Sequence, residues 1–228
     1  MSDLIGKIRS RGYWEVVIRP SRYDKKKIED ITDLFPLIEK LVVRLRGWDF
    51  PHIDYKKHHH IDLDWVGQEF EWQHHKSSWR FYQSGQFAHI SSISLDWRDE
   101  SSLWPADDSW EPGALLGVGD TISTFSEITE FASRLSLSEA GDELMDLRIN
   151  IGGLNGRTLY IDSHSSRWPF DNTYTASIEM FPIKASLGKD ELVARSSEIA
   201  TRYAGELFKR FGWNTTPELI RDWLEKRG

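Results

Sequence analysis

Cysteine is absent from the 228-residue chain, which excludes disulfides, thiolate-bound zinc, iron–sulfur clusters and a cysteine nucleophile. No run of about 18 apolar residues is present, although a membrane-spanning helix requires one. The N-terminal residues also lack the apolar segment of a signal peptide. These absences predict a soluble, cytoplasmic protein that does not associate with membranes.

Familiar catalytic signatures are also missing. The chain has neither the Gly-x-Ser-x-Gly of a nucleophile elbow nor the His-Glu-x-x-His of a zinc protease. The glycine-rich residues 152–156 lack the Lys-Ser/Thr pair of a phosphate-binding loop, and a turn between two strands explains them fully. We therefore predict no cofactor, and the sequence favours a protein that is not an enzyme.

Basic residues are scarce over most of the chain. The formal net charge is −7, yet residues 1–60 hold 13 Lys and Arg against 9 Asp and Glu, so the acidic excess lies in the remainder. Extended nucleic-acid binding requires a broad basic face, so this balance argues against a nucleic-acid partner for the whole chain. Nucleic-acid binding by a local basic patch in the first quarter stays open.

Tryptophan, in contrast, is abundant, with 11 residues. Each Trp buries a large area and needs a partner for its indole N–H, so this density indicates either an aromatic core or a recognition surface. The stretch 79–97 combines two strand-forming runs around Ser84-Gly85 and predicts a tight hairpin, because Gly85 can adopt a positive φ. The predicted register pairs Gln83 with Gln86, Tyr82 with Phe87, Phe81 with Ala88, Arg80 with His89, and Trp79 with Ile90.

This register sorts the side chains of the hairpin onto two faces, because neighbouring residues of a strand point in opposite directions. One face would carry Trp79, Phe81, Ala88 and Ile90, which is typical of a core. The other would carry Arg80, Tyr82, Phe87 and His89, a mixture of aromatic bodies and polar tips that fits either burial or recognition.

The remaining elements are predicted from hydrophobic periodicity and turn residues. Strands are expected at 13–19, 42–46, 65–72, 147–154, 157–162 and 174–181, with Asn155-Gly156 as a second hairpin turn, and helices at 32–41, from Thr124, at 192–211 and from Thr216. Grouped strands with irregularly placed helices predict an α+β fold, with mainly antiparallel sheet of seven to eight strands and three to four helices. A single domain over 1–228 is expected. The alternative is two subdomains, 1–97 and 120–228, joined by a long connection.

One histidine-rich stretch could bind a metal ion. If residues 58–64 form a strand, His58, His60, Asp62 and Asp64 lie on one face and offer two imidazoles and two carboxylates, a ligand set for Zn or Mn that could activate water. The competing interpretation is a solvated loop before the strand at 65–72. Consecutive histidines carry little specificity, so the solvated loop is favoured.

Arginine and aromatic residues indicate a second candidate site. Arg44, Arg46, Trp48 and His52, together with Arg80 and His89, would suit an anion, because the planar guanidinium matches phosphate or carboxylate and the indole offers a stacking face. The alternative is that Arg44 and Arg46 cover the sheet and pair with some of the 36 Asp and Glu residues.

Four motifs give the chain a resemblance to a known family. They are Arg11-Gly-Tyr-Trp14, Val17-Ile-Arg-Pro20, Arg44-Leu-Arg-Gly-Trp-Asp-Phe-Pro-His52 and Trp79-Arg-Phe-Tyr-Gln-Ser-Gly-Gln-Phe87. The chain resembles an uncharacterised bacterial protein family whose members occur alone or next to a Schlafen-type DNA-binding and ATP-binding module. The resemblance implies an accessory or sensing role in bacterial immunity, including anti-phage defence, without an assigned activity.

The leading prediction is a non-enzymatic bacterial binding or regulatory module that holds a protein partner or a small anionic ligand. Its predicted site consists of Arg80, Tyr82, Phe87 and His89, with Arg44, Arg46, Trp48 and His52 at the rim. The alternative prediction is a metal-dependent hydrolase or nuclease centred on His58–Asp64.

Overall fold

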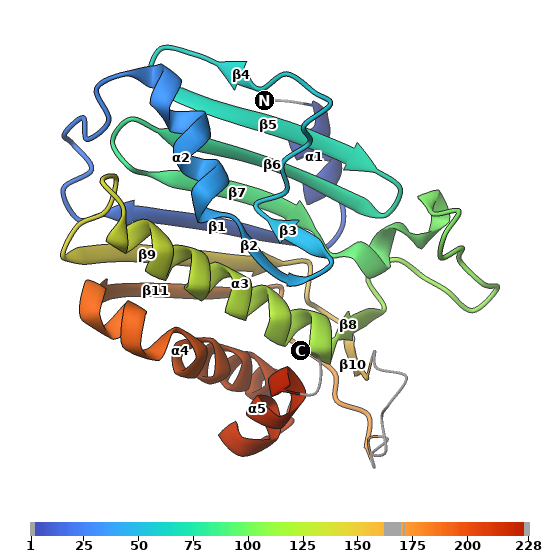
Figure 1. The fold of residues 1–228 in the computed structure, drawn as a ribbon. Coiled ribbons are helices and arrows are strands. Elements are labelled where there is room, and N and C mark those ends of the chain that lie inside the picture. The colour runs from blue at the N-terminus through green and yellow to red at the C-terminus, as the bar shows by residue number, and fades with distance from the viewer. Residues whose placement is uncertain (1–2, 162–169, 171, 226–228) are drawn as a thin grey trace.

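The computed structural model describes residues 3–161, 170 and 172–225. Its centre is a seven-stranded antiparallel sheet, and Figure 1 shows the strands side by side. In sheet order the strands are β11 (Met180–Gly188), β9 (Leu144–Gly152), β1 (Tyr13–Pro20), β7 (Phe87–Ser92), β6 (His75–Tyr82), β5 (Trp65–Trp72) and β4 (His60–Ile61). Strands from both ends of the chain therefore share one sheet.

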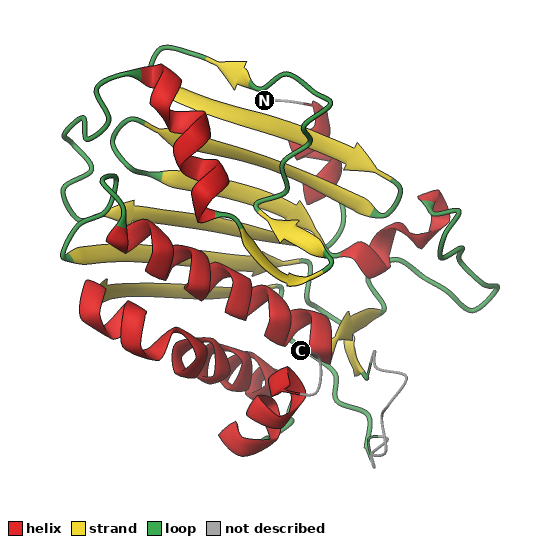
Figure 2. Cartoon of the chain, viewed as in Figure 1, coloured by secondary structure: helices red, strands yellow, loops and turns green. Residues whose placement is uncertain are grey.

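Helices cover the sheet unequally. One face carries α2 (Leu34–Leu41), α3 (Val118–Leu137), α4 (Lys189–Arg210) and α5 (Pro217–Glu225), whereas α1 (Asp3–Arg9) lies on the opposite face against β6 and β7 (Figures 1 and 2). We call the first face the helix face and the second the open face.

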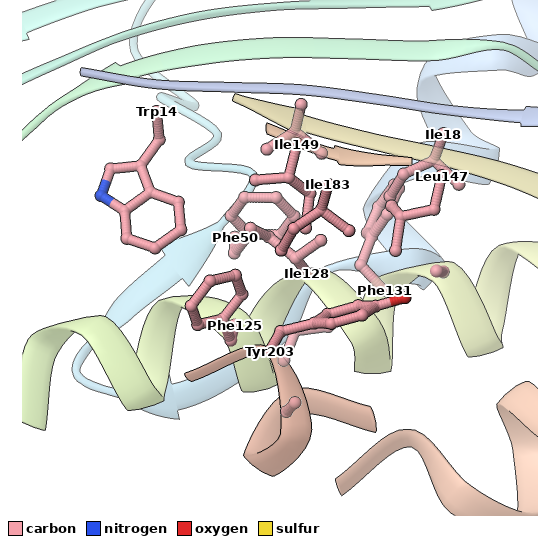
Figure 3. Close-up of a cluster of buried hydrophobic side chains, with 14 of the residues drawn as sticks. Trp14, Ile18, Phe50, Phe125, Ile128, Phe131, Leu147, Ile149, Ile183 and Tyr203 are labelled. Atoms are coloured by element: carbon pink, nitrogen blue, oxygen red, sulfur yellow. The ribbon is translucent and has the colours of Figure 1, made fainter. Parts of the chain in front are cut away.

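The main core fills the space between the helix face and α3 and α4. The alternating burial of β1 places Trp14, Val16 and Ile18 on the helix face, as expected for a strand with one covered side. The Trp14 ring and the Phe125 ring of α3 meet edge to face, with 5.0 Å between their centroids, and Phe131 lies further along the same stripe of α3 (Figure 3). Each such side chain stabilises the fold by about 1.5–3 kcal/mol on burial.

Two small sheets flank the helix face. The strands β2 (Val43–Arg46) and β3 (Trp48–Phe50) pair antiparallel, and β8 (Leu115–Gly117) and β10 (Thr158–Tyr160) pair in parallel. Two 3₁₀ helices, η1 (Ile31–Asp33) and η2 (Ser94–Glu100), complete the elements of the described chain. Among these residues, no helix combines the length and apolar character that crossing a membrane requires.

The α+β prediction with a mainly antiparallel sheet is confirmed, with five α-helices in the described residues instead of three to four. The predicted hairpin around Asn155-Gly156 is wrong. Gly156 does have a positive φ of 80°, but β10 leaves the main sheet and pairs with β8. The strand predicted at 157–162 corresponds to β10, and residue 162 lies outside the described residues. The strand expected at 174–181 shares only Met180 and Phe181 with β11, which covers Met180–Gly188.

A buried ion pair anchors the turn at which the chain leaves the sheet. The side chain of Arg157 is 1% exposed and donates to Asp96 of η2, with 2.8 Å between Nη1 and Oδ1. The same guanidinium donates to the carbonyls of Gly153 and Leu115. These bonds tie the turn after β9 to η2 and β8. Both edges of β9 are paired, one with β1 and the other with β11, so no edge of β9 is left for β10.

Candidate functional site

The register of the central hairpin differs from the prediction by one residue. Phe81 pairs with Phe87, Arg80 with Ala88 and Trp79 with His89. The amide of Tyr82 donates to the carbonyl of Gln86, and the amide of Gly85 donates to the carbonyl of Tyr82. The loop therefore has three residues, Gln83, Ser84 and Gly85, and Gly85 takes the positive φ of 81° that this loop type requires.

The shift moves one half of the predicted binding face to the other side of the sheet. Phe87 and His89 lie on the helix face beside Trp79 and are 0% and 7% exposed. Arg80 and Tyr82 lie on the open face, where the Arg80 guanidinium covers the ring of Trp65 at 4.3 Å. The prediction that Arg80, Tyr82, Phe87 and His89 line a common face is therefore wrong, because a one-residue slip reverses every side chain of one strand.

A cavity of about 550 Å³ opens on the helix face, between the β2–β3 hairpin, the ends of β6 and β7, and the start of α3. Its lining includes four of the eight predicted site residues, namely Arg46, Trp48, His52 and His89. Arg44, Arg80, Tyr82 and Phe87 do not line it. The volume falls within the range typical of small-molecule sites.

One wall of the cavity is a series of stacked rings. Trp48 of β3 lies nearly parallel to His52 and to His75, with centroid distances of 4.2 and 4.0 Å. His75 contacts His74 at 4.1 Å, and His74 lies 6.1 Å from Trp104. We call these five residues the ring series. Its last member, Trp104, is 59% exposed at the cavity mouth, so a flat surface remains open there.

The imidazoles of the cavity are neutral at physiological pH. Burial lowers the pKa of His75 and of His89 to about 3, and burial also lowers the pKa of His52 and of His74. A neutral imidazole offers one donor nitrogen and one acceptor nitrogen. These rings thus provide hydrogen bonds without positive charge.

Arg46 is paired with carboxylates, as the alternative interpretation anticipated. Its guanidinium makes two hydrogen bonds of 2.9 Å to the carboxylate of Glu127 and one of 2.8 Å to Asp120. It also donates to the hydroxyl of Thr124 at 2.9 Å. Arg44 is exposed and donates to Asp49 at 3.2 Å. With its donors directed at acids, Arg46 is poorly placed to bind an anionic ligand.

Thr124 and Glu127 have the spacing of a capping box, which predicts that a helix begins at Thr124. The helix α3 instead begins at Val118, so both residues lie inside it. Their side chains face β2 and hold Arg46, and Glu127 is only 3% exposed. The spacing Thr-x-x-Glu therefore places two side chains on one helical face, which serves the cavity rather than a cap.

Besides Nδ1 of His52 in the ring series, two buried polar atoms of cavity-lining residues have no hydrogen-bond partner among the described residues. They are Nδ1 of His89 and Oγ of Ser77, and the two residues are 7% exposed. Both line the cavity, and the register makes them diagonal neighbours on β6 and β7. A buried polar atom without a partner costs about 1–3 kcal/mol, so a ligand that bonds to both would recover that free energy.

Sequence reasoning missed Ser77 and His75 because the strand was expected to begin at Trp79. The strand β6 starts at His75, and its alternation places His75 and Ser77 on the same face as Trp79 and Phe81. Extending the period-2 pattern backwards from Trp79 would have identified both.

The predicted metal cluster does not converge. His58, His60, Asp62 and Asp64 are all exposed. Within residues 3–161, 170 and 172–225, no group of three or more His, Asp and Glu side chains is arranged to hold a metal ion. The short β4 ends at Ile61, and the following turn bonds through its backbone, with the amide of Asp62 donating to Trp65. The described geometry matches the solvated-loop interpretation.

In comparisons with known proteins, no family model, no curated protein and no solved structure matches the chain. The fold class and the cavity are thus the basis on which its function can be inferred.

Proposed function

We propose that the chain is a non-enzymatic binding module whose ligand is a small molecule held in the cavity above β6 and β7. The observation that carries the proposal is the pair of unpartnered buried atoms, Oγ of Ser77 and Nδ1 of His89, on the floor of a cavity of about 550 Å³. A pocket with aromatic walls and a few convergent polar groups is the usual form of a small-molecule site.

The charges around the cavity favour a ligand without net negative charge. Asp49, Asp120 and Glu127 line it, whereas Arg46 is bonded to two of these carboxylates. The ammonium of Lys76 donates to the carbonyl of Gln73 and pairs with Glu100 at 2.8 Å. A phosphate or carboxylate ligand would therefore meet an acidic lining, so a neutral or cationic ligand is preferred over the anion considered first.

A protein partner is a second candidate, favoured by one observation. Leu103 and Trp104 are 63% and 59% exposed on the segment after η2, beside the mouth of the cavity. Large apolar side chains in such a position are common in interfaces. The family resemblance extends either proposal to an accessory or sensing role in bacterial anti-phage defence. The metal-dependent hydrolase or nuclease at His58–Asp64 has no comparable support.

Native mass spectrometry, combined with thermal unfolding, tests the proposal with a library of neutral, cationic and anionic compounds of low mass. Ser91 is half-buried on the cavity side of β7, so Ser91→Trp fills the space that a ligand would occupy. Ser186→Trp makes the same change at an exposed position of β11 and serves as the control.

We expect neutral or cationic compounds to bind the wild type and Ser186→Trp equally, and to lose at least about tenfold in affinity in Ser91→Trp. Circular dichroism confirms that each variant is folded. Binding that is the same in Ser91→Trp, or a set of hits that are all anions, would contradict the proposal. A co-purified protein in place of a small molecule would favour the second candidate.

A further inference from the structure

The cavity combines a flat aromatic wall, a polar floor and an acidic rim, and each part restricts the chemistry of its occupant. The class of small molecule inferred from these parts rests on the proposed function, since it would bind at that same site.

The wall selects a flat ring. The ring series His52, Trp48, His75, His74 and Trp104 lines one side of the cavity. Its rings cover one another, and the exposed end at Trp104 presents an open aromatic face. Trp72, which is 46% exposed, lies parallel to Trp48 within 5° and adds a further indole surface at the mouth. Bases stack favourably on aromatic side chains, so a planar heterocycle gains more here than a non-planar molecule of the same size.

The floor selects a ring with both donors and acceptors on its edge. Oγ of Ser77 can donate and accept, and Nδ1 of His89 donates or accepts according to its tautomer. The two atoms are buried and unpartnered, and their residues line the cavity as diagonal neighbours on adjacent strands. A purely apolar aromatic would leave both atoms unsatisfied.

The rim selects hydroxyl groups and rejects phosphate. Asp49 and Asp120 place carboxylates at the cavity, where hydroxyl donors would be accepted and phosphate oxygens repelled. The neighbouring cation of Arg46 is held by Glu127 and Asp120.

We infer that the cavity binds an unphosphorylated nucleoside, with its base stacked on the exposed end of the ring series at Trp104, the base edge bonded to Ser77 and His89, and the ribose hydroxyls directed to the acidic rim. The base could also come from a single-stranded nucleic acid, so the test separates these two sources.

Isothermal titration calorimetry tests the inference. The titrants are adenosine, guanosine, cytidine and uridine, their 5′-monophosphates, ribose, and a mixed-sequence single-stranded oligonucleotide. We expect at least one nucleoside to bind, its monophosphate to bind at least about tenfold more weakly, and ribose to show no measurable binding. Tighter binding of the oligonucleotide or of a monophosphate would overturn the inference.

Two variants and a matched control locate the contact. Ser77→Ala and His89→Phe each remove one floor atom, and we expect each to weaken nucleoside binding about five- to tenfold. Ser78→Ala is the control, since Ser78 is equally buried but faces the opposite side of β6. Equal affinity in all three variants would overturn the assignment of the floor.

The same samples separate this inference from the proposed function. If no nucleoside binds but another neutral compound does, and Ser91→Trp abolishes that binding, the inferred nucleoside ligand is wrong and the proposed binding module stands. If no compound shows binding that Ser91→Trp abolishes, both the nucleoside inference and the proposed function are wrong.

Discussion

At the scale of single residues, the pair of Asp96 and Arg157 is the most buried electrostatic contact described. Asp96 also accepts hydrogen bonds from the backbone amides of Gly12 and Gly113, at 2.8 and 3.0 Å. The carboxylate and the guanidinium therefore join the segment before β1, the turn after β9, η2 and the segment that leads to β8. Burying two charges is costly, and the added hydrogen bonds offset that cost.

Removing one member of this pair should destabilise the fold strongly. We expect Arg157→Met to lower the free energy of unfolding by about 3–5 kcal/mol, because Asp96 is left buried without its counter-charge. Urea unfolding followed by circular dichroism measures the change. The control is Arg195→Met, in an exposed pair with Glu198, where the loss should stay below about 1 kcal/mol. Equal losses in the two variants would contradict the account.

The cavity histidines predict a dependence of stability on pH. The pKa of His75 and of His89 is about 3 in the folded chain and about 6.5 in the unfolded chain. Between these values the unfolded chain binds more protons, so stability is full above pH 6.5 and falls as the pH drops towards 3. Each histidine contributes a slope of up to about 1.4 kcal/mol per pH unit.

Urea unfolding at pH 7.5, 6.0 and 5.0 measures this slope. We expect the double variant His75→Gln with His89→Gln to flatten it, and the variant of the exposed His60, His60→Gln, to leave it as in the wild type. A wild-type stability that is constant between pH 7.5 and 5.0 would show that the imidazoles are not held neutral.

At the scale of elements, the conformation of the central hairpin turn predicts a large loss of stability when Gly85 is given a side chain. Gly85 has a φ of 81°, and a Cβ at this position would lie 2.1 Å from the carbonyl oxygen of Ala140. We expect Gly85→Val to lower the free energy of unfolding by at least about 2 kcal/mol, through backbone strain and this clash. Thermal unfolding monitored by circular dichroism detects the loss.

Gly156 offers the matched control, because its φ is 80° and nothing lies within 4 Å of the position its Cβ would take. Gly156→Val should show the strain without the clash, and hence a smaller loss than Gly85→Val. If the two variants melt at the same temperature, the close approach of Ala140 has no energetic role.

The same hairpin shows how far the sequence could be interpreted. The alternation of apolar residues around Gly85 was sufficient to predict a hairpin, and the α+β class followed from the grouping of strands. A loop of two residues and a loop of three both place glycine at a positive φ, so local sequence could not choose the register. The cavity was beyond prediction because β3, β6, β7 and α3 meet there only through long-range packing.

At the scale of the whole molecule, the sheet crosses the boundary at which two subdomains were considered. β1 pairs with β7 on one side and with β9 on the other, and α3 packs against strands from both segments. We expect a single cooperative unfolding transition, with coincident curves from tryptophan fluorescence and circular dichroism. Two separated transitions would indicate that residues 1–97 and 120–228 unfold independently.

The central claim is that the cavity above β6 and β7 is a binding site, and NMR of the histidine rings during titration with the compound that binds the wild type most tightly tests it most directly. The account predicts that the ring signals of His52, His75 and His89 shift to saturation, while those of His58 and His60 stay unchanged. Shifts confined to His58 and His60, or no shift at any ring, would contradict it.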